Sequence, residues 1–232
     1  MRLRRAPAGA AAQAFVGAAR PAPGMAWREA RWCAVDLEMT GLDPRTDEII
    51  AIGAVPIDDG RVVLGGAMYT LVRASKRSKV GAVLVHKLRL ADVAEAPSLD
   101  EAIDLVLEAM AGRVPVFHTA AIEAGFLKRQ FARRHVRLPA AADTEVLGRR
   151  WLRMRDGQEP AHGLSLGRLA AALGHPGEVP HHALADALTT AQTFIALATR
   201  LDAVEPQTVR TLLAPGVGEA MRTMGARRLG PG

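Results

Sequence analysis

Residues 34–41 read AVDLEMTG, an apolar, strand-like stretch that carries two carboxylates, Asp36 and Glu38. Because successive side chains of a strand point to opposite faces, these two acids share one face of the strand and the apolar residues around them line the other. Two like charges side by side are unfavourable unless a cation lies between them, and carboxylate oxygens suit a hard divalent ion. The alternative is an exposed polar face of a half-buried strand, so the rest of the chain has to decide.

The composition is that of a globular protein with a basic surplus. The chain has 232 residues, of which 49% are hydrophobic and 23% charged, enough for one sizeable domain with a buried core. A formal net charge of +6 suggests a polyanionic partner such as nucleic acid, although an Arg-rich bias from a GC-rich genome gives the same balance. The single cysteine, Cys33, excludes an internal disulfide and indicates a reducing, cytoplasmic compartment. No apolar run approaches the roughly 18 residues of a membrane span, so no membrane association is expected.

Composition divides the chain into three parts. Residues 1–24 contain Arg, Ala, Pro and Gly but no acid, and a flexible arm is expected there; a transit peptide and a true start at Met25 are the alternatives. Residues 25–203 carry the regular patterns of a folded domain. Regular periodicity is lost beyond Val204, so residues 204–232 are expected to form a tail with at most one short helix.

The first half of the domain is strand-like. Residues 31–39, 48–57 and 61–72 have strand patterns, and the sequence Asp58-Asp59-Gly60 between the last two is a hairpin turn signal. We therefore expect an antiparallel meander.

The second half alternates between strand and helix patterns. A helix is predicted from Ser98, which has capping-box spacing to Glu101, to Gly112. A buried strand follows over residues 114–119, and three further helices are predicted over residues 120–135, 162–174 and 181–201. This order predicts an α/β sandwich with a mixed sheet.

Three motifs follow one another as in a known nuclease family. Residues 35–55 read VDLEMTGLDPRTDEIIAIGAV, residues 116–127 read VFHTAAIEAGFL, and residues 181–187 read HHALADA. They resemble the three motifs of the DEDDh branch of the 3′–5′ exonucleases, the DnaQ-like superfamily that includes the epsilon proofreading subunit of bacterial DNA polymerase III. VHKLRLADV at residues 85–93 and ADTEVL at residues 142–147 look like weaker landmarks of that family. The resemblance implies a ribonuclease H-like fold with a mixed five-stranded sheet flanked by helices.

The resemblance also implies a site for two divalent ions, Mg²⁺ or Mn²⁺, held by four carboxylates. Asp36 would bridge both ions. Glu38 and Asp186 would complete the first site, and Glu123 would reach the second ion through water.

The same resemblance implies that His181 is the general base on the attacking water, while His182 takes the variable position of the third motif. The second motif departs from the family pattern at two places: Thr119 replaces a frequent Asn, and Glu123 replaces the usual Asp. The additional methylene of Glu123 moves its carboxylate by about 1.5 Å. A reduced or Mn²⁺-dependent activity is one expectation from that change.

Substrate contacts are expected from Met39, Thr40 and Gly41, where the backbone can approach a terminal nucleotide. Phe126 could form an apolar wall, with ordinary core packing as the alternative. A run of arginines could follow phosphates or line a solvated helix face. It comprises Arg149, Arg150, Arg153 and Arg155.

Together these features predict a metal-dependent 3′–5′ exonuclease that releases nucleoside monophosphates from the 3′ end of DNA or RNA, alone or on a polymerase. The rival prediction is a catalytically silent nucleic-acid-binding or polymerase-accessory module in which Glu123 spoils the second metal site. The presence of the other expected site groups favours the enzyme; they are Asp36, Glu38, His181 and Asp186.

Overall fold

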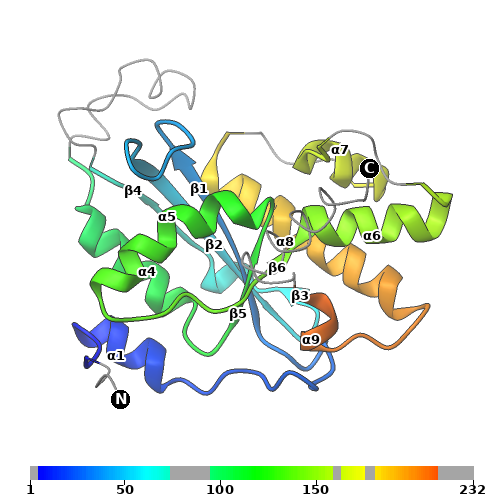
Figure 1. The fold of residues 1–232 in the computed structure, drawn as a ribbon, viewed down its shortest axis with the longest axis horizontal. Coiled ribbons are helices and arrows are strands. Elements are labelled where there is room, and N and C mark those ends of the chain that lie inside the picture. Colours follow the sequence, from blue (N-terminus) through cyan, green and yellow to red (C-terminus); the bar gives the residue numbers. More distant parts are fainter. Residues whose placement is uncertain (1–4, 74–94, 159–162, 176–180, 214–232) are drawn as a thin grey trace, which may run out of the picture.

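The computed structural model describes residues 5–73, 95–158, 163–175 and 181–213, which form a mixed β-sheet flanked by helices (Figure 1). The strands are β1 (Trp32–Met39), β2 (Ile49–Asp58), β3 (Arg61–Val62), β4 (Met68–Leu71), β5 (Val114–Phe117) and β6 (Ala142–Asp143). They pair in the order β3-β2-β1-β5-β6, and β4 also pairs with β2. β1 to β4 pair antiparallel, whereas β5 lies parallel to β1 and β6 parallel to β5. The predicted combination of an antiparallel meander with parallel strands is confirmed.

The sheet contains six strands in the described residues, where five were predicted. The difference arises in residues 61–72, because a 3₁₀ turn at Leu64–Gly66 divides the expected strand into β3 and β4, which both pair with β2. Two consecutive glycines in this turn offer no side chain to pack and weaken a continuous strand. The predicted hairpin between β2 and β3 is present, with positive φ angles of 52° at Asp59 and 68° at Gly60.

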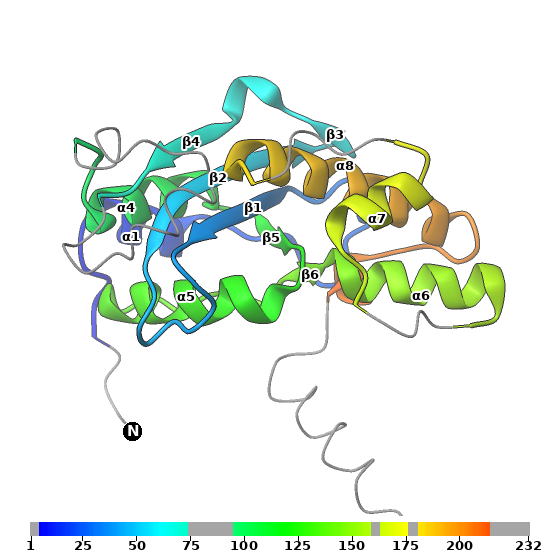
Figure 2. The same cartoon turned by 90° about the horizontal axis from the view of Figure 1, so that it is seen from above.

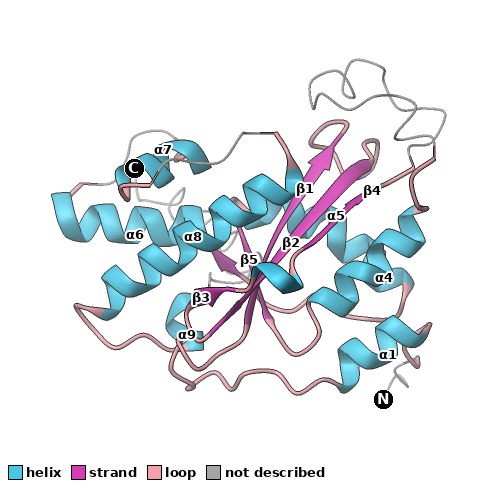
Figure 3. Ribbon diagram, turned by 180° about the vertical axis from the view of Figure 1, so that it is seen from behind, coloured by secondary structure: helices cyan, strands magenta, loops and turns pink. Residues whose placement is uncertain are grey.

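Helices cover both faces of the sheet (Figure 2). They are α1 (Ala10–Gly17), α4 (Leu99–Ala109), α5 (Ala120–Arg133), α6 (Thr144–Asp156), α7 (Leu166–Ala172), α8 (Ala183–Asp202) and α9 (Val209–Leu212). One hydrophobic core joins α1, α4 and α5 to one face, and a second joins α6 to α9 to the other. In Figure 3 the strands run between these two groups. Within the described ranges, no helix is both long and apolar enough to cross a membrane.

Side chains of β1 alternate between these two cores. Cys33, Val35 and Leu37 lie in the core of α1, α4 and α5, whereas Trp32 and Ala34 lie in the core of α6 to α9. Asp36 and Glu38 continue the second set by strand alternation. The two acids therefore project from the face that α8 covers.

The four predicted helices are present, with their ends shifted by a few residues, and α6 is an additional one. In α4, the Ser98 hydroxyl accepts a hydrogen bond from the Glu101 N–H (3.3 Å) and the Glu101 carboxylate accepts one from the Ser98 N–H (2.8 Å), so the predicted capping box is confirmed. Helix α6 escaped prediction because its many arginines dilute the apolar pattern, although Leu147 and Trp151 are buried one turn apart.

The expectation of a flexible arm is wrong for the segment that forms α1. Its residue Phe15 is fully buried and packs edge-on against Phe131 of α5, with 5.6 Å between the ring centroids. Ala12 on the same side of α1 is also fully buried. An Ala-rich segment without acids can thus be a packed helix, because Ala has high helix propensity and one aromatic side chain anchors it.

The expected domain boundary at residue 204 is also too early. Val209 and Leu212 of α9, the short helix foreseen in the tail, are buried in the core of α6 to α9. The backbone N–H of Val209 donates to the Met25 carbonyl (3.0 Å), and Thr208 forms a β-bridge with Ala26. The Arg210 N–H also donates to the carbonyl of Pro23, in the predicted arm (2.8 Å). The start of the predicted tail therefore packs as part of the domain.

Replacing Phe15 tests whether α1 belongs to the cooperative fold. Phe15→Ala is expected to lower the free energy of unfolding by about 3 kcal/mol, because it removes a fully buried aromatic side chain. Val16→Ala is the matched control, since Val16 is 53% exposed on the same helix, and its effect should stay within about 0.5 kcal/mol. Urea unfolding followed by circular dichroism measures both, and equal effects would mean that α1 does not contribute to the core.

Candidate active site

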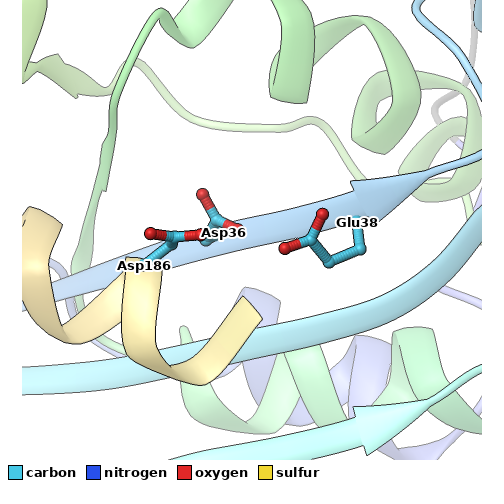
Figure 4. Close-up of side chains that lie close together, drawn as sticks. All are labelled: Asp36, Glu38 and Asp186. Carbon is cyan, nitrogen blue, oxygen red and sulfur yellow. The ribbon is translucent and has the colours of Figure 1, made fainter. Parts of the chain in front are cut away.

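Three carboxylates meet where β1 approaches the start of α8 (Figure 4). Asp36 and Glu38 come from β1, and Asp186 comes from the first turn of α8. One carboxylate oxygen of each lies within 4.8 Å of the others. Glu38 is buried, and the two aspartates are partly exposed. An all-oxygen set of this kind suits Mg²⁺ or Mn²⁺.

A glycine in β2 lets α8 come this close. Gly53 pairs with Asp36 across the sheet, and the first turn of α8 lies directly on it. A Cβ atom at Gly53 would lie 2.2 Å from the carbonyl oxygen of Ala183. Since that neighbour is backbone, any side chain at this position would displace the start of α8 and carry Asp186 away from the strand carboxylates.

Burial and mutual repulsion make these acids hard to ionise. Burial raises the pKa of Asp36 well above its usual range, and the charges of Asp186, Glu123 and Glu38 add to the shift. Burial and the charge of Asp186 raise the pKa of Glu38 to about 7. Burial also raises the pKa of Asp186, although the backbone N–H groups of His181 and His182 stabilise its ionised form. A divalent cation would relieve this repulsion.

Glu123 lies in the first turn of α5, outside the group of three carboxylates but close enough for its charge to raise the pKa of Asp36. Its side chain is buried, and its Oε2 atom has no hydrogen-bond partner among the described residues. Burial raises the pKa of Glu123 to about 8. A buried carboxylate oxygen without a partner is costly, so this one fits a direct or water-mediated contact with a cation.

His181 and His182 differ in their contacts. The backbone N–H of His181 donates to Oδ2 of Asp186 at 2.8 Å, and the charge of His181 lowers the pKa of Glu38 and of Asp186. His182 is the N-cap of α8, with its Nδ1 atom accepting from the Ala185 N–H at 3.4 Å. His181 therefore faces the carboxylates, whereas His182 secures the helix start.

The substrate residues expected from the first motif border a tight loop. The Thr40 N–H donates to the Glu48 carbonyl (2.9 Å), and the Thr40 hydroxyl accepts from the Glu48 N–H (3.0 Å). At Gly41 a Cβ atom would lie 2.4 Å from the Asp47 carboxylate, so only glycine fits without a shift of that side chain. Met39 is half-buried beside this loop.

Phe126 is 4% exposed and belongs to the core of α1, α4 and α5. Its position therefore fits core packing, the alternative interpretation, better than a role as an apolar wall of the site.

The arginine run of α6 mostly pairs within the protein. Arg149 forms an ion pair with Glu145 (2.9 Å), and Arg150 donates to the Thr211 carbonyl (3.1 Å). Arg155 pairs with Asp156 (2.6 Å) and lies over the ring of Trp151. Arg153 also has an interaction within the protein. These contacts favour the helix-face interpretation over phosphate binding.

Asp143 is a buried carboxylate whose role sequence reasoning missed. It accepts hydrogen bonds from the backbone N–H groups of Thr119 (3.2 Å), Ala120 (2.9 Å) and Glu145 (2.9 Å). One side chain thus caps both α5 and α6 and fixes the helix start that carries Glu123. The available signal was its place in the ADTEVL segment, one of two weaker landmarks; the other, residues 85–93, lies outside the described residues.

Comparison with known proteins matches the chain to exonucleases and to DNA polymerase III proteins. Residues 33–194 match the exonuclease family of the RNase T type. The chain is 34% identical over 171 residues to a DNA polymerase III subunit epsilon-like protein of Rhodobacter capsulatus, and 30% identical over 172 residues to a PolC-type DNA polymerase III of Thermotoga petrophila. These alignments cover 72% and 73% of this chain but only 24% and 12% of the relatives, so the chain spans a minor part of their length.

Solved structures with the same fold include two nucleases described with nucleic acids. One is Exonuclease X in complex with 5′ overhanging duplex DNA, with a TM-score of 0.58 and 22% identity over 78% of this chain and 96% of that one. The other is a 3′-exonuclease that recognises a histone mRNA stem-loop, with a TM-score of 0.62 and 16% identity over 79% of this chain and 68% of that one. Both likenesses support the ribonuclease H-like fold.

The raised pKa values predict that the cation-free protein loses stability as pH rises. In the folded state Glu38 and Glu123 hold their protons up to about pH 7 and 8, whereas in the unfolded state they ionise near 4.3. The folded state therefore binds more protons in this interval, and the free energy of unfolding falls between about pH 4.3 and 8. In EDTA the melting temperature should fall by on the order of 5 °C across this window, and saturating Mg²⁺ should restore it at pH 8.

Asp36→Asn removes a buried carboxyl group whose pKa is raised on folding, and with it that group's share of the loss of stability at high pH. This variant in EDTA at pH 8 should therefore melt above the wild type. Glu108→Gln, at an exposed position of α4, is the control and should keep the wild-type pH dependence. Differential scanning calorimetry from pH 4 to 8 gives both comparisons. A melting temperature that rises with pH in EDTA would contradict the assigned proton uptake.

Proposed function

Because this chain belongs to the exonuclease family, we propose that it is a divalent-metal-dependent 3′–5′ exonuclease that releases nucleoside monophosphates from the 3′ end of DNA or RNA. The family makes it a nuclease domain; polarity, metal use and substrate are the proposal. The observation that carries it is the convergence of Asp36, Glu38 and Asp186 within 4.8 Å.

The proposed ion ligands are the three clustered carboxylates together with Glu123. Their oxygen-only chemistry and the unpartnered Oε2 atom of Glu123 fit Mg²⁺ or Mn²⁺. When bound, two such ions would acidify the attacking water and neutralise charge on the scissile phosphate. The protein would contribute by holding these carboxyl groups together. Without a cation their raised pKa values favour the protonated form, and a bound cation would favour the ionised form.

His181 is proposed as the general base. Its electrostatic coupling to Glu38 and Asp186 supports a place beside the clustered carboxylates. Histidine is the side chain that most often acts as a general base, and here it would accept the proton of the water that attacks the phosphate. The partly exposed aspartates leave the cluster accessible from solvent, as a polymeric substrate requires.

The rival function is a silent nucleic-acid-binding or polymerase-accessory module. The replacement of the family's Asp by Glu123 is the observation in its favour, and the intact cluster with its neighbouring histidine favours the enzyme. The matches to DNA polymerase III proteins support a polymerase as a possible partner. The neighbours in complex with DNA and with RNA support either nucleic acid as substrate.

Labelled oligonucleotides test the proposed function. With Mg²⁺ or Mn²⁺, 5′-labelled DNA or RNA should shorten stepwise, and 3′-labelled substrate should release its label as a mononucleotide in the first step. EDTA should abolish both reactions. Asp36→Ala should reduce them by at least 10³-fold, because the bridging ligand is lost from both ion sites. Binding of oligonucleotides without hydrolysis under any metal would instead support the silent module.

Variants at Glu123 test the second ion site. Glu123→Asp restores the family's usual ligand and should keep or raise the rate, most visibly in Mg²⁺, whose octahedral geometry is strict. Glu123→Gln keeps the length and most of the packing but removes the charge, so it should lower the rate and weaken Mn²⁺ binding in calorimetric titrations. A Gln variant with wild-type rates and metal dependence would remove Glu123 from the site.

A further inference from the structure

One row of the sheet links the carboxylate cluster to an aromatic residue of β4. Asp36 on β1 pairs with Gly53 on β2, and Gly53 pairs with Tyr69 on β4. Residues directly opposed in antiparallel strands point to the same face of the sheet. Asp36 and Tyr69 therefore lie on the face that α8 covers, separated by the bare backbone of Gly53.

The start of α8 fills the space between them. Ala183, the first residue of the helix, lies on Gly53. Toward β1, Asp186 meets Asp36 in the carboxylate cluster. Toward β4, the ring of His182 stacks on Tyr69, with 4.7 Å between ring centroids and 19° between ring planes. The first turn of α8 thus lies between the carboxylate cluster on one side and an aromatic contact on the other.

The stacking of Tyr69 on His182 matters for the site because His182 directly follows His181 in the chain. His181 has a φ of 65°, a left-handed conformation that is strained for a non-glycine residue and persists only where neighbouring contacts enforce it. In this conformation its backbone N–H donates to Asp186. Fixing the adjacent ring of His182 limits how far the backbone at His181 can relax.

We propose that Tyr69 is a positioning residue: by stacking on His182 it fixes the first turn of α8, and with it the places of Asp186 and His181 in the site. The effect of Tyr69 on His181 as general base rests on the proposed function. The effect of Tyr69 on Asp186 concerns cation binding alone and can be measured without catalysis. Tyr69 itself needs no contact with substrate or cation.

Tyr69→Ala, Tyr69→Phe, His182→Ala and the double alanine variant test this, with two measurements. Calorimetric titration with Mn²⁺ should show about fivefold weaker binding for Tyr69→Ala. Its kcat on an oligonucleotide should fall about tenfold with little change in KM. Tyr69→Phe should restore wild-type values, because it keeps the ring. The double variant should be no worse than His182→Ala, which removes the same stacking contact together with the N-cap hydrogen bond from Ala185.

Leu64→Ala is the matched control, because Leu64 is 66% exposed in the 3₁₀ turn just before β4 and its replacement should leave both measurements unchanged.

Three outcomes overturn the proposal. They are wild-type Mn²⁺ affinity in a folded Tyr69→Ala variant, a Tyr69→Phe variant that loses as much as Tyr69→Ala, and a double variant whose loss equals the sum of the two single losses. If Tyr69→Ala does not fold, unchanged Mn²⁺ affinity in His182→Ala overturns it. A wild-type chain that binds Mn²⁺ but cleaves no oligonucleotide would sink the proposed function alone, and the titrations would still decide the role of Tyr69.

Discussion

The site depends on one backbone contact, that of Ala183 in α8 with Gly53 in β2. This contact sets the distance between α8 and the sheet. Asp186 of α8 reaches Asp36 and Glu38 only when that distance is short. A side chain as small as a methyl group at Gly53 would separate the two elements. The carboxylate cluster therefore depends on a residue that has no side chain, and Gly53 pairs with Asp36 on the neighbouring strand.

The contact also creates an electrostatic conflict. Packing α8 on the sheet brings acids together in a partly buried place, where ionisation is opposed by burial and by each other's charge. Folding and cation binding are consequently linked: an ion that binds the folded state alone stabilises it by an amount that grows with the logarithm of its concentration. The electrostatic strain of the cation-free cluster is the counterpart of the proposed affinity for a divalent ion.

Much of this arrangement can be predicted from the sequence, because it depends on residues that are close together in the chain. Strand alternation places Asp36 and Glu38 on one face, and capping-box spacing locates the start of α4 at Ser98. What could not be read depends on distant partners. Phe15 is buried because Phe131 lies opposite, and Asp143 matters because it accepts N–H groups from a helix that precedes it in the chain. Gly53 looks like any glycine in a strand until α8 lies on it.

The position of α8 across β1 and β2 also bears on the order in which the chain can fold. The hairpin of β1 and β2 is local in sequence, whereas α8 comes from near the end of the described chain, so its docking closes a long loop and should follow hairpin formation. Until then Asp36 and Glu38 face water, where the repulsion between their charges is weak. The arrival of α8 desolvates them, and its own acid arrives with it. The last large step of folding is therefore the one that assembles the charged centre, and a divalent ion present at that moment would favour the docked helix over the open hairpin.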